Sequence, residues 1–481
     1  MAQRSGALVG IDVGTSSAKG IAVDPDTGRV LATAEREYPV SSPHAGWMEQ
    51  QPEEWLAATR DVIARLKAET SEILGIGFSG QMHGLVCLDA EGSVIRPAIL
   101  WNDQRSAPQC AILEAGDGLE RLLRLTGNRA LPGFTAPKLL WMRENEPEEY
   151  ERIRRICLPK DFVRDHLVGT HCMDVADASG TLFLDVGARL WSSELLSWLD
   201  IPRWWLPQLA ESTDPVGTLD GAPVAAGAGD QAAAAVGAGI TGPGPLSVVL
   251  GTSGVVLAAT TDYLPDSKGR VHAFCHAVPD RWMVMGVMLS AAGSLAWYHD
   301  TLLPDVAYDA MLDEAERIAP GSEGLTFLPY LAGERTPYAD PDARGAFCGL
   351  SVTHGRGALT RAVLEGVAFG LRDCLDTVNN VGATAARGRV SGGGSRSRLW
   401  LQIVATALEI PLEIMATDQG SAFGAALLGG VASGVYRDLD QAADACVRVT
   451  EVIDPVAGWI APYRDARARF RAYYPALRSV G

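Results

Sequence analysis

A carboxylate followed by a turn rich in glycine and hydroxyl groups stands near the start of the chain. Leu8–Ile11 is apolar and β-prone, Asp12 is the one charge that interrupts the run, and Gly14-Thr15-Ser16-Ser17 follows. Carboxylate oxygens are hard ligands for Mg²⁺, and the N–H and O–H groups of such a turn can donate to phosphoryl oxygens. The same residues also fit an ordinary hairpin with a polar turn. The motif therefore allows a metal–phosphate site without establishing one.

The same strand–turn–strand unit recurs in the second half of the chain. Leu246–Leu250 is apolar, Gly251-Thr252-Ser253-Gly254 supplies the turn, and Val255–Ala259 is a second apolar run. Thr15 and Thr252 occupy equivalent places in the two units. An internal repeat of this kind predicts two related domains that face each other. It also favours a functional over a purely structural interpretation of both turns.

A second carboxylate, Asp230, follows a short predicted strand at Pro223–Ala226 and the tripeptide Gly227-Ala228-Gly229. It begins an alanine-rich segment that we predict to be a helix. Asp is a preferred N-cap residue, so a structural cap is one interpretation. The two glycines have no side chains to shield the carboxylate, however, and a substrate hydroxyl could reach it.

Polar residues follow two further predicted strands. Ile73–Phe78 leads into Ser79-Gly80-Gln81-Met82-His83-Gly84, and Ile99–Trp101 leads into Asn102-Asp103-Gln104-Arg105. Ligands in α/β folds bind outside the carboxyl ends of strands, so both segments are candidate binding segments. A structural histidine at His83 and a helix cap at Asp103 are the alternatives.

A glycine run near the C-terminus offers backbone groups to a ligand. The predicted strand Arg389–Ser391 enters Gly392-Gly393-Gly394-Ser395, and a helix follows, whose first N–H groups can bind an anion. The chain contains neither a G-x-G-x-x-G nor a Walker A motif, so neither a Rossmann nor a P-loop site is supported. The small residues Gly420–Ala426 predict a helix that packs closely, either on another element or on a flat group such as adenine.

The bulk properties exclude several classes of protein. The 481 residues predict two large or three smaller domains, and a net charge of −17 disfavours nucleic acid and anionic membranes as partners. The eight cysteines are scattered without a C-x-x-C pair, which indicates reduced thiols and a cytoplasmic protein. The long, mainly helical region 116–205 carries no chemistry of its own and could shape one wall of a site.

Nine motifs, in this order along nearly the whole chain, resemble the FGGY carbohydrate kinases and, within them, the kinases that act on D-xylulose. They are Gly-Ile-Asp-Val-Gly-Thr-Ser (10–16), Ser-Gly-Gln-Met-His-Gly (79–84), Trp-Asn-Asp-Gln-Arg (101–105), Pro-Gly-Phe-Thr-Ala-Pro-Lys (132–138), Leu-Pro-Lys-Asp (158–161), Gly-Asp-Gln-Ala-Ala (229–233), Leu-Gly-Thr-Ser-Gly (250–254), Gly-Glu-Arg-Thr-Pro (333–337) and Gly-Gly-Gly-Ser-Arg-Ser (392–397).

The resemblance implies an α/β fold with two ribonuclease-H-like (actin/hexokinase-type ATPase) domains flanking a cleft. The N-terminal domain, 1–241, would bind the sugar and carry the catalytic base, and the C-terminal domain, 242–481, would bind the nucleotide. The expected reaction is ATP- and Mg²⁺-dependent phosphorylation of D-xylulose to D-xylulose 5-phosphate in the cytoplasm, by a homodimer that binds neither nucleic acid nor membrane. The alternatives are a kinase of another pentulose or pentitol, such as D-ribulose or D-arabinitol, and an actin-like nucleotide-switched scaffold.

The resemblance also implies roles for individual residues. Asp230 matches the base that takes the proton of the attacking hydroxyl, and Asp12 matches the acidic residue that helps hold Mg²⁺. The remaining expected contacts are Met82, His83, Gln81, Asp103 and Gln231 for the sugar, Thr15, Ser16, Gly251 and Thr252 for phosphate, and Gly393, Gly394 and Ser395 for adenosine. Two departures stand out: Ala228 where many relatives have a third glycine, and Asp418-Gln419 where relatives often carry Glu.

Overall fold

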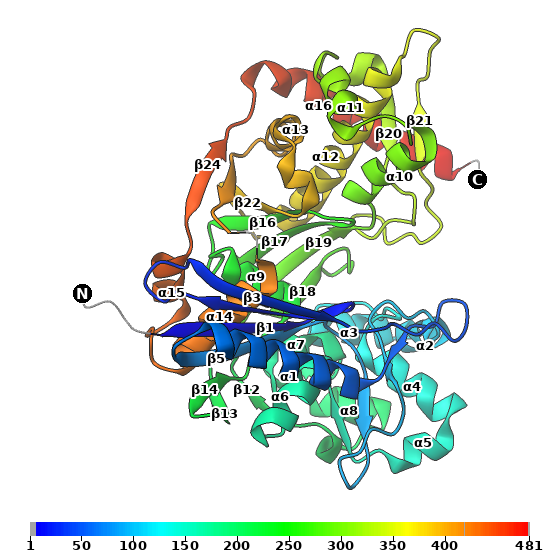
Figure 1. The fold of residues 1–481 in the computed structure, drawn as a ribbon. Helices are drawn as coiled ribbons and strands as arrows, with labels where there is room; N and C mark the ends of the chain where they lie inside the picture. Colours follow the sequence, from blue (N-terminus) through cyan, green and yellow to red (C-terminus); the bar gives the residue numbers. More distant parts are fainter. Residues whose placement is uncertain (1–5, 418, 480–481) are drawn as a thin grey trace.

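The computed structural model describes residues 6–417 and 419–479 of the chain. Its two halves are each built on a seven-stranded mixed sheet, and the two sheets lie one above the other in Figure 1. The first sheet has the order β13 (Pro215–Leu219), β14 (Ala222–Ala225), β5 (Ile73–Gly80), β1 (Ala7–Val13), β2 (Ser17–Val23) and β3 (Val30–Glu37), with β15 (Ala228–Gly229) paired to β5.

The second sheet repeats this arrangement. Its order is β18 (His272–Cys275), β19 (Trp282–Met288), β17 (Gly254–Thr260), β16 (Pro245–Leu250), β22 (Arg387–Ser391), β23 (Leu412–Met415) and β24 (Val449–Ile453). The hairpins β1–β2 and β16–β17 are antiparallel, while β1 runs parallel to β5 and β16 runs parallel to β22. The predicted internal repeat and the two-domain α/β class are therefore confirmed.

Helices cover the outer faces of the two sheets (Figure 1). α1 (Pro52–Glu69) has proline in its first turn together with Glu53 and Glu54, which suits the positive end of the helix dipole, and it packs on β2 and β3. α12 (Arg356–Asn380) is the long buried helix behind β17 and β19. α13 (Arg398–Leu408) and α16 (Ala457–Arg478) complete that layer of the second half.

The remaining helices and strands connect these elements or pack around them. The helices are α2 (Ala107–Glu114), α3 (Gly118–Thr126), α4 (Thr135–Asn145), α5 (Pro147–Arg152), α6 (Pro159–Val168), α7 (Val175–Ala178), α8 (Ser193–Leu199), α9 (Asp230–Gly237), α10 (Ala292–Leu302), α11 (Tyr308–Glu316), α14 (Gly420–Ala432) and α15 (Leu439–Cys446). The strands are β4 (Glu49–Gln50), β6 (Val86–Leu88), β7 (Ala98–Ile99), β8 (Arg155–Cys157), β9 (Cys172–Asp174), β10 (Leu184–Asp185), β11 (Leu190–Trp191), β12 (Gln208–Ala210), β20 (Thr326–Leu328) and β21 (Ala346–Cys348).

The region 116–205, which was predicted to be mainly helical, contains α3 to α8 with short strands between them. It contacts the edge of the second sheet through hydrogen bonds between the two halves. The Ser179 hydroxyl accepts from the Cys275 N–H at 3.0 Å, and the Trp282 indole donates to the Val186 carbonyl at 2.7 Å. This region therefore forms the surface on which β18 and β19 rest.

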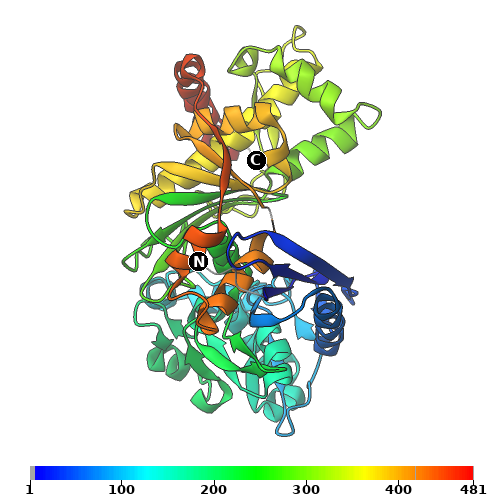
Figure 2. The same cartoon turned by 60° about the vertical axis from the view of Figure 1, so that its left-hand side comes forward.

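Helix α14 belongs to the second half in sequence but packs on the first sheet, against β1 and β5 (Figure 2). Glycines make this approach possible. A Cβ atom at Gly10 would lie 1.9 Å from the Ala422 carbonyl oxygen, and one at Gly77 would lie 1.8 Å from that of Ala425. Real Cβ atoms never come so close, so the small residues of Gly420–Ala426 serve close packing of one element on another, as one of the two interpretations predicted.

Among the described parts of the chain, no helix combines the length and apolarity needed to cross a membrane.

We predict that Gly77→Ala lowers the free energy of unfolding by about 1–3 kcal/mol, because the new methyl group must push α14 away from β5. Urea unfolding followed by circular dichroism measures this change. Gly458→Ala in α16 is the matched control, since a Cβ there meets nothing within 4 Å. Equal stability of the two variants would contradict the close-packing account.

Candidate active site

Three parallel strands bring the two predicted carboxylates to one edge of the first sheet. Asp12 of β1 lies beside Ser79 of β5, and Ser79 lies beside Ala228 of β15. Asp230 follows two residues later, directly after β15 ends. The carboxyl ends of these strands form the edge at which α/β folds bind ligands.

Asp12 is largely enclosed, and its carboxylate is oriented by a neighbouring hydroxyl. Ser79 Oγ donates to Asp12 Oδ1 at 2.7 Å. Burial raises the pKa of Asp12, whereas hydrogen bonds from Ser79 and from Ser421 of α14, together with the charge of Lys19, act in the opposite direction. The second half of the chain thus reaches this carboxylate through α14.

Asp230 is the first residue of α9 but does not cap it. Gly229 is the N-cap residue, and no side chain provides a capping hydrogen bond, so the alternative interpretation as a cap is wrong. Burial and, to a smaller extent, the negative charge of Asp12 raise the pKa of Asp230 to about 7, against hydrogen bonds from Gln231 that lower it. A carboxylate whose proton affinity is raised by a second carboxylate forms a site suited to a proton or a cation.

The segment 81–84 stands next to this pair. Met82 is 5% exposed, and its Cγ would lie only 2.7 Å from a Cβ atom at Gly229. Any side chain at Gly229 would therefore displace Met82 from its place beside Asp230. This contact explains why the residue before Asp230 is glycine.

His83 is held in a defined orientation and tautomer. Its φ angle of 70° is in the left-handed region, and its carbonyl oxygen accepts from Lys138 Nζ and Thr135 Oγ1, each at 3.0 Å. His83 Nδ1 lies 2.9 Å from the Gly180 carbonyl, so Nδ1 carries the proton and Nε2 is left as a hydrogen-bond acceptor. Burial lowers the pKa of His83 to about 3, although the Gly180 carbonyl acts against this, and the ring is therefore neutral near pH 7.

The Gln81 side chain supports the first turn. Its amide nitrogen donates to the Gly14 carbonyl at 3.2 Å and to Gln50 Oε1 at 3.1 Å, and its oxygen accepts from Thr15 Oγ1 at 3.3 Å. These contacts give Gln81 a structural role in shaping the turn. Its expected contact with the sugar stays a prediction.

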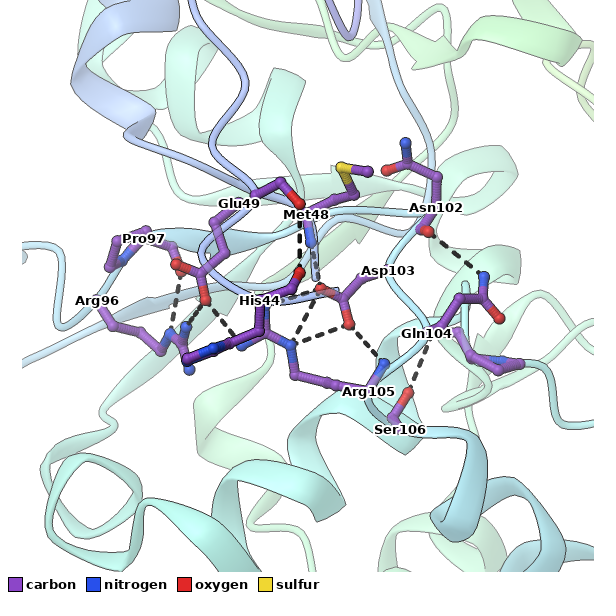
Figure 3. Close-up of polar contacts among 12 residues, drawn as sticks. His44, Met48, Glu49, Arg96, Pro97, Asn102, Asp103, Gln104, Arg105 and Ser106 are labelled. Carbon is purple, nitrogen blue, oxygen red and sulfur yellow. Dashed lines mark hydrogen bonds and ion pairs between the residues drawn. The ribbon is translucent and has the colours of Figure 1, made fainter. Parts of the chain in front are cut away.

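Asp103 is buried in a network of charged groups, which is shown in Figure 3. Asp103 Oδ2 accepts from the Met48 N–H at 2.6 Å, and both carboxylate oxygens accept from the Arg105 guanidinium. Arg105 also pairs with Glu49 at 2.7 Å, and Arg96 contacts Glu49 from the other side. Asp103 thus fastens the segment after β7 to the segment before β4, and its expected sugar contact stays a prediction.

The two glycine-threonine turns offer backbone donors. In the first turn, Thr15 Oγ1 accepts from the Trp101 indole at 3.0 Å, while the N–H groups of Thr15 and Ser16 have no acceptor among the described residues. In the second turn, the carbonyls of Gly251 and Thr252 accept from the first residues of α10 at 2.7–3.1 Å. Both turns are therefore rigidly held and retain N–H groups that could donate to an anion.

A pocket is lined by residues of both halves of the chain. Gln231 of α9, Ser247 of β16, Ser395 and Gly420 contribute to its lining. Ser395 Oγ donates to the Gly392 carbonyl at 2.7 Å, which closes the glycine loop on itself.

Within that loop, Gly394 is packed against Leu250 and Trp400, whereas a Cβ at Gly393 would meet nothing within 4 Å. Gly393 is therefore the glycine whose backbone a ligand could reach. Asp418, one of the two departures from the family pattern, lies outside the described residues, while its neighbour Gln419 lines the pocket.

The sequence reasoning assigned no role to a buried ion cluster behind the site. Lys160 Nζ contacts Asp161 and Asp174 at 2.6 Å and Asp177 at 3.2 Å, and all four side chains are fully buried. Asp177 Oδ1 would lie 3.1 Å from a Cβ at Gly229, so the cluster supports the end of β15. Lys160 and Lys138 belong to two of the family motifs, 158–161 and 132–138. Their place in these motifs is the sequence signal that could have identified them as site-supporting residues.

Comparison with known proteins agrees with this geometry. Models of the FGGY family of carbohydrate kinases match at residues 7–237 for the N-terminal domain and 246–433 for the C-terminal domain. The xylulose kinase of Escherichia coli (strain K12) is 40% identical over 98% of this chain and 99% of its own. That of Bacillus subtilis (strain 168) is 37% identical over 98% of this chain and 97% of its own.

A solved structure is similarly close. The crystal structure of a xyloylose kinase from Brucella ovis superposes with a TM-score of 0.93 at 44% identity, covering 99% of this chain and 100% of that one. Two sheets of matching order, a carboxylate at the end of β15 and full-length similarity to sugar kinases lead to one conclusion: the chain belongs to the FGGY family of carbohydrate kinases.

Proposed function

We propose that this kinase transfers the γ-phosphoryl group of ATP to D-xylulose and releases D-xylulose 5-phosphate and ADP. The observation that carries the proposal is the position of Asp230. It stands at the carboxyl edge of the first sheet, beside Met82 and opposite the charge of Asp12. The similarity to xylulose kinases over nearly the whole chain supports this choice of sugar.

The proposed chemistry follows from the proton affinity of Asp230. The C5 hydroxyl oxygen of the sugar forms a bond to the γ-phosphorus, and Asp230 takes the hydroxyl proton. The bond between the γ-phosphorus and the oxygen that bridges to the β-phosphate breaks, and that oxygen leaves with ADP. The N–H groups of the Thr15 and Thr252 turns are suited to bind phosphate oxygens during this step.

The residues present fit a magnesium ion bound together with a nucleotide. No group of three or more His, Cys, Asp or Glu in the described ranges could hold a metal ion alone. Mg²⁺ in phosphoryl-transfer sites is held by one or two carboxylates plus phosphate oxygens, and Asp12 supplies an oriented carboxylate of this kind. When bound, the ion would neutralise charge on the phosphate oxygens.

We place the enzyme in the cytoplasm, and the absence of any disulfide among the eight cysteines supports this. A homodimer, which the family resemblance implies, stays a prediction. The scaffold alternative loses its support, because both halves match carbohydrate kinase models.

We predict that Asp230→Ala lowers kcat for sugar phosphorylation by about 10²–10⁴-fold while the protein stays folded, because the variant lacks the carboxylate that takes the hydroxyl proton. ADP release is measured with D-xylulose, D-ribulose, D-arabinitol and xylitol, and wild type should prefer D-xylulose. Asp342→Ala is the control, since that carboxylate is 91% exposed. Near-normal turnover by Asp230→Ala would overturn the assignment of the base, and preference for another sugar would overturn the substrate.

A second prediction concerns pH and stability. The pKa of Asp230 is raised from 3.8 to about 7 in the folded chain, so the folded state holds the proton more tightly than the unfolded state. The stability that this group contributes is fully present below about pH 3.8 and is lost as the pH rises through about 7.

Asp230→Asn should therefore raise the Tm of the nucleotide-free, metal-free protein by several degrees at pH 8 and by less at pH 6. Differential scanning calorimetry at both pH values measures the difference. A Tm difference that is the same at both pH values, or larger at pH 6, would contradict the raised pKa.

A further inference from the structure

The segment Gly333-Glu334-Arg335-Thr336-Pro337, whose motif the proposed reaction leaves without a role, is fixed against β19. The Thr336 N–H donates to the Val287 carbonyl at 2.9 Å, and Thr336 Oγ1 donates to the Arg270 carbonyl at 2.7 Å. Glu334 Oε1 accepts from the N–H groups of Leu289 and Arg335 at 3.0 and 2.7 Å. The backbone of Arg335 therefore has little freedom to move.

The Arg335 guanidinium contacts His272, and a chain of hydrogen bonds defines that contact. Asn128 Nδ2 donates to the carbonyls of Thr126 and Ala273 at 2.7 and 2.9 Å, so Asn128 Oδ1 must be the acceptor for His272 Nδ1 at 2.7 Å. His272 Nε2 is then unprotonated, and it accepts from Arg335 NH1 at 3.4 Å. One long hydrogen bond leaves most of the five guanidinium N–H donors unused.

Arg335 is partly buried and forms no ion pair with a carboxylate among the described residues, which distinguishes it from the buried arginines. Arg105, Arg164 and Arg361 each form an ion pair of 2.7–3.0 Å with an acidic side chain. Burial lowers the pKa of Arg335, and the neighbouring Glu334 offsets this only in part. A partly buried guanidinium whose donors the protein leaves mostly unused is suited to donate hydrogen bonds to the oxygen atoms of a ligand.

The surroundings of Arg335 connect it to the proposed sugar site. The His272 ring centroid lies 5.9 Å from that of Phe134, which lies 4.5 Å from that of His83. The charge of Arg335 contributes to the lowered pKa of His83. Met82 lies against Gly229, which precedes Asp230, while the next residue, His83, is linked through Phe134 and His272 to Arg335.

We propose that Arg335 binds the sugar, donating hydrogen bonds to the oxygen atoms at its C1–C2 end. This inference rests on the proposed function, which places the C5 hydroxyl at Asp230. Guanidinium groups only donate, and the C2 carbonyl oxygen only accepts, so the pair is complementary. Because Arg335 belongs to the second half of the chain and His83 to the first, the sugar joins the two halves.

Steady-state kinetics on four proteins and three substrates tests the proposal. The proteins are wild type, Arg335→Met, Arg335→Lys and the control Arg344→Met, whose side chain is 67% exposed on the same connecting segment. The substrates are D-xylulose, 1-deoxy-D-xylulose, which lacks the C1 oxygen, and xylitol, which replaces the C2 carbonyl by a hydroxyl group. Circular dichroism and Tm establish that each variant is folded.

We expect Arg335→Met to raise the KM for D-xylulose by about tenfold or more with little change in the KM for ATP, and Arg335→Lys to fall in between. For at least one of the two analogues, the loss in kcat/KM relative to D-xylulose should be about tenfold or more in wild type and about twofold or less in Arg335→Met. A merely structural role would not produce this dependence on a substrate oxygen, and Arg344→Met should behave as wild type.

The proposal would be overturned if, for both analogues, the fall in kcat/KM relative to D-xylulose were the same in Arg335→Met as in wild type. It would also be overturned if Arg335→Met raised the KM for ATP as much as the KM for the sugar. Failure of the proposed function is distinguishable, because wild type would then leave D-xylulose unphosphorylated. The role of Arg335 could still be decided in that case. Wild type and Arg335→Met would be compared on the sugar that wild type prefers and on an analogue of that sugar that lacks the oxygen farthest from the phosphorylated hydroxyl.

Discussion

The mutual repulsion of Asp12 and Asp230 is the constraint on which the rest of the site depends. Asp12 and Asp230 belong to the carboxyl ends of two strands that flank β5, and two partly buried carboxylates in one site cannot both be ionised cheaply. Burial and the charge of Asp12 together raise the pKa of Asp230 to about 7. This pair of carboxylates costs stability in the protein without ligands. For the same reason it is well suited to accept a proton and a bound cation during phosphoryl transfer.

Holding this arrangement requires rigid supports from several elements. Ser79 orients Asp12, the cluster around Lys160 supports the end of β15, and Lys138 holds the backbone of His83 in a left-handed conformation. Each support is buried and contacts the site from behind. The region 116–205 thus contributes Lys138 and Lys160 as well as the surface on which the second sheet rests.

The two halves of the chain build the site jointly. Helix α14 crosses to the first sheet, where Gly10 and Gly77 allow it to lie within contact of the backbone, and its Ser421 reaches Asp12. From the opposite side, Arg335 approaches His83 through His272. Nucleotide and sugar would therefore both contact groups from each half, which couples their binding to the relative position of the two sheets.

The sequence by itself determined the repeated hairpins, the positions of Asp12 and Asp230 at strand ends, and the family, because these depend on local patterns and on motif order. Strand alternation and glycine turns are short-range signals, and the repeat made them unambiguous. Only the tertiary structure decided that the side chains of Gln81 and Asp103 form hydrogen bonds within the protein, that Asp230 does not cap its helix, and that α14 lies on the first sheet. These facts depend on contacts between residues far apart in the chain, and a side chain's partners are set by packing that no local pattern encodes.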